Sequence, residues 1–178
     1  MEKLPIDVLN HIITYLDNAV YLRLVNKRLN EKYKYEVKFL ITKKNILKVP
    51  CNFIIIELQL SKEIKDEDII KNIKKLKNVK TLKCGDNDNL TDEGINKLPL
   101  TTLDCGENKK FTDEGIKGLP LTTLDCGENE KFTDEGIKGL PLTTLKCRCN
   151  RNFTDEGIKG LPLTTLDCGK NNRITIRI

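Results

Sequence analysis

The chain has 178 residues, of which 38% are hydrophobic and 32% charged, and its formal net charge is +5 at pH 7. This balance predicts a soluble globular protein, and no run approaches the roughly 18 consecutive apolar residues of a membrane-spanning helix. Basic residues outnumber acidic ones 17 to 10 over residues 1–80, but acidic residues lead 16 to 14 over 81–178, and there is no Trp. With so few aromatic side chains to stack on bases, the composition argues against a nucleic-acid-binding protein.

The first segment, residues 4–38, is predicted to form two or three short helices. Apolar residues recur there at helical spacing, after a proline at the helix start and with Asp7 in the first turn. The first group is Leu4, Val8, Leu9, Ile12, Tyr15 and Leu16, and the second is Val20, Leu22, Leu24, Val25 and Leu29. The start lacks the apolar core and cleavage site of a secretory signal, so we expect an intracellular protein, cytoplasmic or nuclear, with reduced thiols.

The letters "LPIDVLNHIITYLD" and "LRLVNKRLN" in this segment resemble the F-box, although Leu29 stands where that family usually has Trp. The resemblance implies an F-box-like module over residues 1–38, followed by a connection at 39–54. It also implies docking on the SKP-type adaptor of a cullin–RING ubiquitin ligase. The residues expected to bind the adaptor are Leu4, Pro5, Val8, Leu9, Ile12, Tyr15, Leu16, Leu22, Leu24 and Val25.

Residues 55–178 repeat one pattern with a period of 21, which indicates a solenoid. Leucines fall at the same slot of each copy, and so do cysteines: Leu82, Leu103, Leu124, Leu145 and Leu166, then Cys84, Cys105, Cys126, Cys147 and Cys168. A looser copy begins 24 residues earlier with Ile55, Leu58 and Leu60, and its helix should be longer. The last letters, "RITIRI", put Ile174 in the Phe132 slot and then alternate, so we expect a closing edge there.

Each copy is predicted to contain a short strand, a turn and a short helix. Leu124 and Cys126 lie two apart, so they point to the same side of a strand, and stacked copies pair their strands into a parallel sheet. Asn129 should turn the chain by bonding backbone groups, and Thr133 should cap the helix, with acidic residues in its first turn. Gly139-Leu140-Pro141 should end the helix. We expect Lys117, Lys138 and Lys159 to face Asp113, Asp134 and Asp155, four residues earlier.

This pattern resembles the leucine-rich repeat, with Cys in the third apolar slot. The related FNIP-type repeat, also found behind F-boxes, overlaps it in part, but "TDEGI" in every full copy favours the leucine-rich repeat. The predicted fold is therefore an α/β solenoid, with a parallel sheet on one face and short helices on the other, behind a small helical module. F-box segments joined to such repeats serve as substrate receptors.

The cysteine ladder is predicted to be core filler, because buried Cys behaves as a small apolar side chain. A zinc site would need CxxC spacings and histidine ligands, whereas the chain has one His. No triad and no phosphate-binding glycine loop is evident, so we expect neither a cofactor nor a metal nor an enzyme. Cys149 replaces the Glu of its sister copies and is expected in a loop, either as a tolerated residue or as an exposed, modifiable thiol.

Variation between copies is confined to outward positions, and the fourth copy differs most, with Lys146, Arg148 and Cys149. We expect a protein target to bind this face through Lys83, Asp104, Asp125, Lys146, Arg148 and Asp167. The alternative is neutral drift of a duplicated unit. The function predicted is a non-catalytic substrate receptor of an SCF-type ubiquitin ligase. A second hypothesis is a stand-alone interaction scaffold whose N-terminal helices only cap the array.

Overall fold

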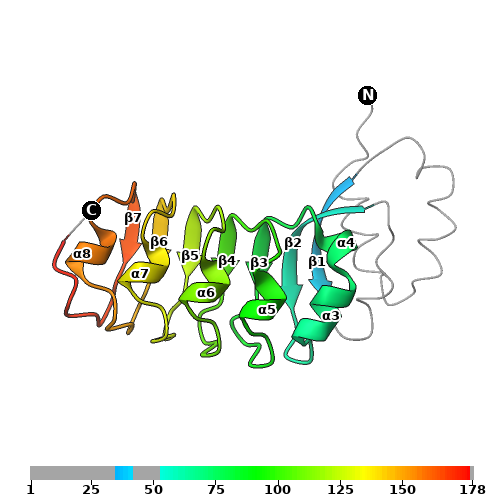
Figure 1. Ribbon diagram of the computed structural model, residues 1–178, viewed down its shortest axis with the longest axis horizontal. Helices are drawn as coiled ribbons and strands as arrows, with labels where there is room; N and C mark the ends of the chain where they lie inside the picture. Colours follow the sequence, from blue (N-terminus) through cyan, green and yellow to red (C-terminus); the bar gives the residue numbers. More distant parts are fainter. Residues whose placement is uncertain (1–34, 42–52, 177–178) are drawn as a thin grey trace, which may run out of the picture. The chain divides into compact units, whose positions relative to one another are not determined.

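The computed structural model describes residues 35–41 and 53–176, and residues 36–178 belong to one compact unit. Seven strands form one sheet in chain order (Figure 1). They are β1 (Tyr35–Ile41), β2 (Phe53–Leu60), β3 (Thr81–Lys83), β4 (Thr102–Asp104), β5 (Thr123–Asp125), β6 (Thr144–Lys146) and β7 (Thr165–Asp167). From β2 to β7 every neighbouring pair is parallel, and Leu82, Leu103 and Leu124 stand in one register. The predicted α/β solenoid with a parallel sheet is confirmed.

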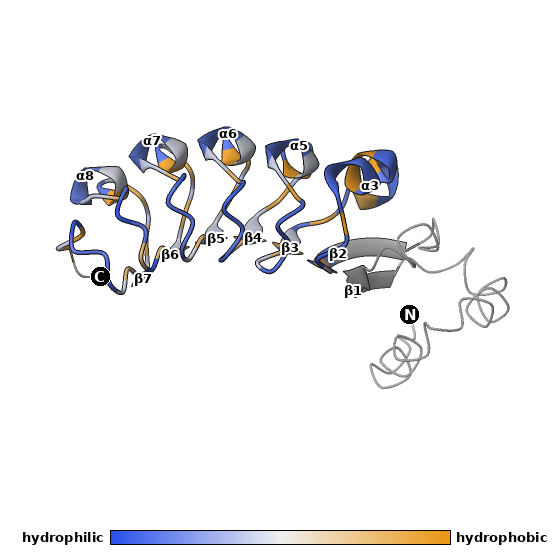
Figure 2. Ribbon diagram, turned by 90° about the horizontal axis from the view of Figure 1, so that it is seen from below, coloured by the Kyte–Doolittle hydropathy of each residue, from blue (hydrophilic) through white to orange (hydrophobic). Residues whose placement is uncertain are grey.

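Short helices follow the strands and lie on the other side of the repeats. They are α3 (Asp66–Lys71), α4 (Ile73–Leu76), α5 (Asp92–Ile95), α6 (Asp113–Ile116), α7 (Asp134–Ile137) and α8 (Asp155–Ile158). Figure 2 shows the helices on the outer side of the curved repeats and the strands on the inner side. The first copy has two helices where the others have one, as its longer period predicts. Helix α7 ends where Gly139 adopts a positive φ of 75°.

The core is a set of columns that run through the repeats. Leu103, Leu124, Cys105 and Cys126 are all 0% exposed, and Phe111, like its counterparts in the next two copies, is fully buried. Leu58, Leu60, Ile64 and Ile69 fill the same slots in the first copy. The four cysteines from Cys84 to Cys147 are buried, which confirms the predicted core ladder, whereas Cys168 in the last strand is half-buried.

A column of buried asparagines turns the chain after each strand. Asn129 is 0% exposed, and its amide nitrogen donates to the carbonyls of Asn108 (2.8 Å) and Phe111 (2.9 Å) in the preceding copy. Its Oδ1 accepts from the backbone N–H of Lys131 at 2.8 Å. One side chain thus satisfies three backbone groups that the bend would leave unpaired, as predicted. The members of the column are Asn87, Asn108, Asn129, Asn150 and Asn171.

A second ladder joins the helix starts of successive copies. Asp92, the first residue of α5, accepts from the N–H of Thr112 at 2.9 Å and from its hydroxyl at 2.6 Å, one copy later. Asp66, Asp113 and Asp134 make the same two bonds to Thr91, Thr133 and Thr154, and Asp155 makes them to Thr175. These threonines also begin the helices, and Thr133 Oγ1 accepts from the N–H of Glu135. The acidic residue after each threonine is therefore an inter-repeat bond acceptor as well as a favourable charge at a helix start.

This ladder corrects the expected lysine pairs. Because the Asp carboxylates are occupied by threonines of the next copy, Lys117, Lys138 and Lys159 pair with the neighbouring Glu residues. Lys117 Nζ lies 3.2 Å from Glu114 Oε1, three residues earlier, and both side chains are 73% exposed. Lys138 and Lys159 contact Glu135 and Glu156 in the same way. Such exposed pairs contribute little to stability.

The two ends of the described repeats depart from the pattern. Strand β1 covers residues that the sequence placed in the helical module and the irregular connection, and its pairing in the sheet was not anticipated. At the other end Ile174 takes the Phe slot and is 3% exposed, as predicted. Residues 172–176 contain no strand, so the expected closing edge is instead a loop, which Thr175 fixes to Asp155.

Candidate interaction surface

The outward side of the sheet, called here the sheet face, is built from three columns. The first consists of Thr81, Thr102, Thr123, Thr144 and Thr165, and the second of Lys83, Asp104, Asp125, Lys146 and Asp167. The third consists of Gly85, Gly106, Gly127, Arg148 and Gly169. Since side chains alternate along a strand, these residues lie opposite the Leu and Cys columns of the core. Threonine and glycine form a low background, and charged side chains stand between them.

Ion pairs connect neighbouring strands on this face. Lys83 Nζ lies 3.0 Å from Glu57 Oε1 on β2, and Lys146 Nζ lies 3.3 Å from Asp125 Oδ2. Arg148 Nε donates to Asp167 Oδ2 at 2.8 Å. The basic side chains are 47–68% exposed, so each pair is open to solvent on one side. Exposed pairs of this kind contribute at most about 1 kcal/mol, and a partner's charges can replace them.

Asp104 differs from the other acidic residues of its column, since it makes no ion pair with any described residue. Partial burial raises its pKa, and the neighbouring Asp125 carboxylate raises it further, against smaller opposing effects of the Gly106 N–H, Lys146 and Lys83. The hydrogen bond from Arg148 instead lowers the pKa of Asp167. The centre of the sheet face therefore holds two adjacent carboxylates and a single lysine bonded to one of them.

All six residues predicted to bind a target lie on this face, within five consecutive strands. Lys83, Lys146 and Arg148 are exposed, and Asp104, Asp125 and Asp167 are half-buried. The sequence analysis missed Glu57, which pairs with Lys83, because β2 belongs to the copy that matches the pattern least. The ten residues predicted to bind an adaptor, from Leu4 to Val25, lie outside the described residues.

The ladder thiols offer no reactive site. Burial raises the pKa of Cys105 and Cys126 well above its ordinary value, and it raises the pKa of Cys147 to about 12. Cys149 is half-buried at a positive φ of 62°, where its N–H donates to the Gly169 carbonyl at 3.0 Å. The sequence placed it in a loop, and it begins the turn after β6.

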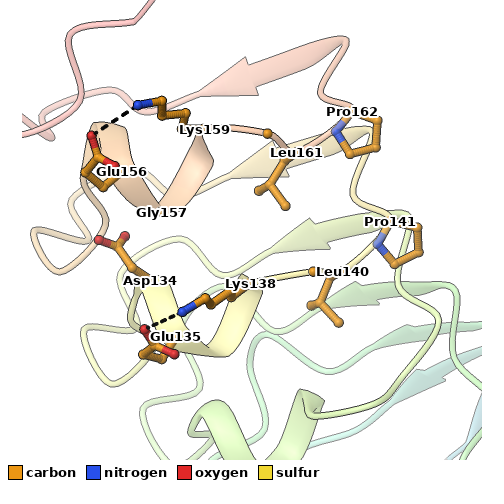
Figure 3. A pocket seen from close by; sticks show the side chains of 12 residues that line it. Asp134, Glu135, Lys138, Leu140, Pro141, Glu156, Gly157, Lys159, Leu161 and Pro162 are labelled. Atoms are coloured by element: carbon orange, nitrogen blue, oxygen red, sulfur yellow. Dashed lines mark hydrogen bonds and ion pairs between the residues drawn. The ribbon is translucent and has the colours of Figure 1, made fainter.

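A groove lies on the helix side between α7 and α8, where Leu140, Pro141, Leu161 and Pro162 line it beside charged residues (Figure 3). Its lysines contact its own glutamates, Lys138 with Glu135 at 3.3 Å and Lys159 with Glu156 at 3.8 Å. Among the described residues no three His, Cys, Asp or Glu side chains are grouped as metal ligands. The charged sheet face is therefore the stronger candidate for binding.

Within the described ranges, no helix is long and apolar enough to span a bilayer. No protein-family model matches the chain, and a search of curated proteins finds no significant match.

Proposed function

We propose that the protein is a non-catalytic substrate receptor of an SCF-type ubiquitin ligase, with an F-box-like segment that binds a SKP-type adaptor and a leucine-rich-repeat array that holds a protein target. The observation that carries the proposal is the exposed, charged sheet face on a regular α/β solenoid. Such an architecture fits leucine-rich repeats and protein interaction, since the core columns hold the array together and leave the outward columns free for a ligand. The adaptor-binding half is supported by the F-box resemblance of residues 4–38.

The array supports recognition better than catalysis. Its buried polar side chains, the asparagines, are fully engaged with backbone groups, and its buried thiols have raised pKa values. The charged groups of the sheet face are paired with one another or stand on an open surface. Groups in these settings suit contacts with a large partner, because neither an enclosed pocket nor an activated nucleophile is formed by the described residues.

Capture of a purified SKP-type adaptor by the full chain tests the adaptor half. We expect capture by the wild-type chain and its loss when Leu4, Pro5 and Ile12 are all replaced by alanine. The matched control is Lys138→Asp with Lys159→Gly on the helix side, which should capture the adaptor normally. If the wild-type chain fails to capture the adaptor, or the alanine variant captures it equally well, the protein is instead a stand-alone interaction scaffold.

A further inference from the structure

The charges of the sheet face are segregated along the array. We consider the face together with its rim, defined as the first turn residue after each strand: Asp86, Glu107, Glu128, Cys149 and Lys170. Over β3 to β5 the face and rim carry Lys83 against five acidic residues, a net charge of −4. Over β6 and β7 they carry Lys146, Arg148 and Lys170 against Asp167, a net charge of +2.

The segregation does not depend on where the rim is cut. The remaining exposed turn residues add two acidic and three basic side chains to the first half, which stays negative at −3. They add Arg151 and Arg173 to the second half, which rises to +4. Side chains on the rim are exposed, so their charges reach a partner that lies across the strands.

The ion pairs inside the face leave room for a competing partner. Lys83 is held by Glu57, so the acidic half contains Asp104 and Asp125 with one lysine, Lys146, shared from the boundary. Asp104 has no ion pair among the described residues, and its raised pKa reflects the nearby Asp125 carboxylate. A lysine or arginine from a partner would relieve this repulsion, because an opposite charge within about 4–6 Å favours both ionised carboxylates.

We propose that the target segment recognised by this face is a protein segment with segregated charges, in which a short basic block lies over β3 to β5 and a short acidic block over β6 and β7. The inference rests on the proposed function, since it names the class of target that the array holds. Neighbouring strands lie about 4.8 Å apart, so β3 to β7 span about 19 Å. An extended chain at about 3.3 Å per residue crosses them in about six residues. Each block is therefore two to four residues long.

Synthetic peptides test the charge order on the full-length protein. The probe has three lysines, two serines and three glutamates in that order, and the control peptide interleaves the same lysines and glutamates. A third peptide carries lysine in place of the glutamates. By fluorescence anisotropy at low salt, we expect the segregated peptide to bind about tenfold tighter than either control, and the difference to shrink at high salt.

The variant Lys146→Asp with Arg148→Gly removes the basic half. Both replacements are the residues that β5 and its turn carry at the same slots, Asp125 and Gly127, so the repeat accommodates them. The matched control, Lys138→Asp with Lys159→Gly, makes the same change in net charge on the helix side. We expect the first variant to lose the preference for the segregated peptide and the control to keep it.

Three results would overturn the inference: equal affinity for the segregated and interleaved peptides, equal affinity for the all-basic peptide, or a preference that persists in the Lys146/Arg148 variant. None of these bears on adaptor capture, which depends on residues 4–38. Loss of the peptide preference with adaptor capture intact would refute the charge order alone. A retained preference without adaptor capture would refute the ligase assignment alone.

Discussion

Replacing Gly115 by alanine should destabilise the array, although the same change in most helices is stabilising by about 1 kcal/mol. The added Cβ would lie 2.2 Å from Asp92 Oδ1 and 2.8 Å from its Cγ. To restore ordinary contact the carboxylate must move by about 1 Å or more, away from the N–H and hydroxyl of Thr112. Hydrogen bonds to a charged group contribute about 1.5–3 kcal/mol each, so we expect a net loss of about 2–5 kcal/mol.

Urea unfolding followed by circular dichroism measures this loss. Gly118→Ala is the matched control, because Gly118 has open space around its Cβ position and a φ of 74°, so only the left-handed backbone costs about 1–2 kcal/mol. In an Asp92→Ala background the clash is gone, and Gly115→Ala should become neutral or stabilising. A Gly115→Ala variant that is as stable as the wild type, or more stable, would refute the inter-repeat role of Asp92.

Three further changes test other parts of the structure. Asn129→Ala should lower the free energy of unfolding by about 3–6 kcal/mol in the same urea assay, since it leaves three buried backbone groups unpaired; a loss below 1 kcal/mol would contradict the ladder. Asp104→Asn should raise the melting temperature at pH 7, because the raised pKa of Asp104 makes its ionised form costly in the folded state, and this gain should vanish below pH 3.8, where the folded and unfolded chains are both protonated. A gain that persists or grows at acid pH would be the wrong sign. Under native conditions a thiol reagent should label Cys149 and Cys168, identified by peptide mapping, and should spare Cys84, Cys105, Cys126 and Cys147; rapid labelling of Cys126 would mean that the core column is open to water.

The core columns could be predicted from the sequence because one period fixes them. A residue that recurs every 21 positions must meet its own counterpart when copies stack, so Leu124, Cys126 and Asn129 were assigned correctly to buried positions. The same logic gave the threonine caps and the glycine at the helix ends. It also identified which charged residues share the sheet face, since a strand's alternation separates inner from outer positions.

The bonds between copies were harder to predict, because a local explanation was already sufficient for the residues concerned. Asp113 follows a capping threonine, where a helix start favours an acid, and nothing in one copy shows that its carboxylate reaches Thr133 in the next. Gly136 has its reason in the same contact, since a Cβ there would lie 2.0 Å from Asp113 Oδ1. Strand β1 was missed because residues 35–41 contain no repeat motif.

Ion pairing on the sheet face could not be read from the columns alone. The register places Lys146 beside both Asp125 and Asp167, and the choice between them depends on side-chain reach. Arg148, one slot further along, takes Asp167 and leaves Lys146 to Asp125. The single unpaired carboxylate, Asp104, follows from this arrangement rather than from its own sequence position.

The division of labour between the two parts of the chain is the central claim, and one capture experiment tests it directly. Purified adaptor and the charge-segregated peptide are offered together to the wild type, to the Leu4/Pro5/Ile12 alanine variant and to the Lys146→Asp, Arg148→Gly variant. The account predicts that the first variant loses only the adaptor and the second loses only the peptide. Loss of both ligands in either variant, with the fold intact by circular dichroism, or retention of both would contradict it.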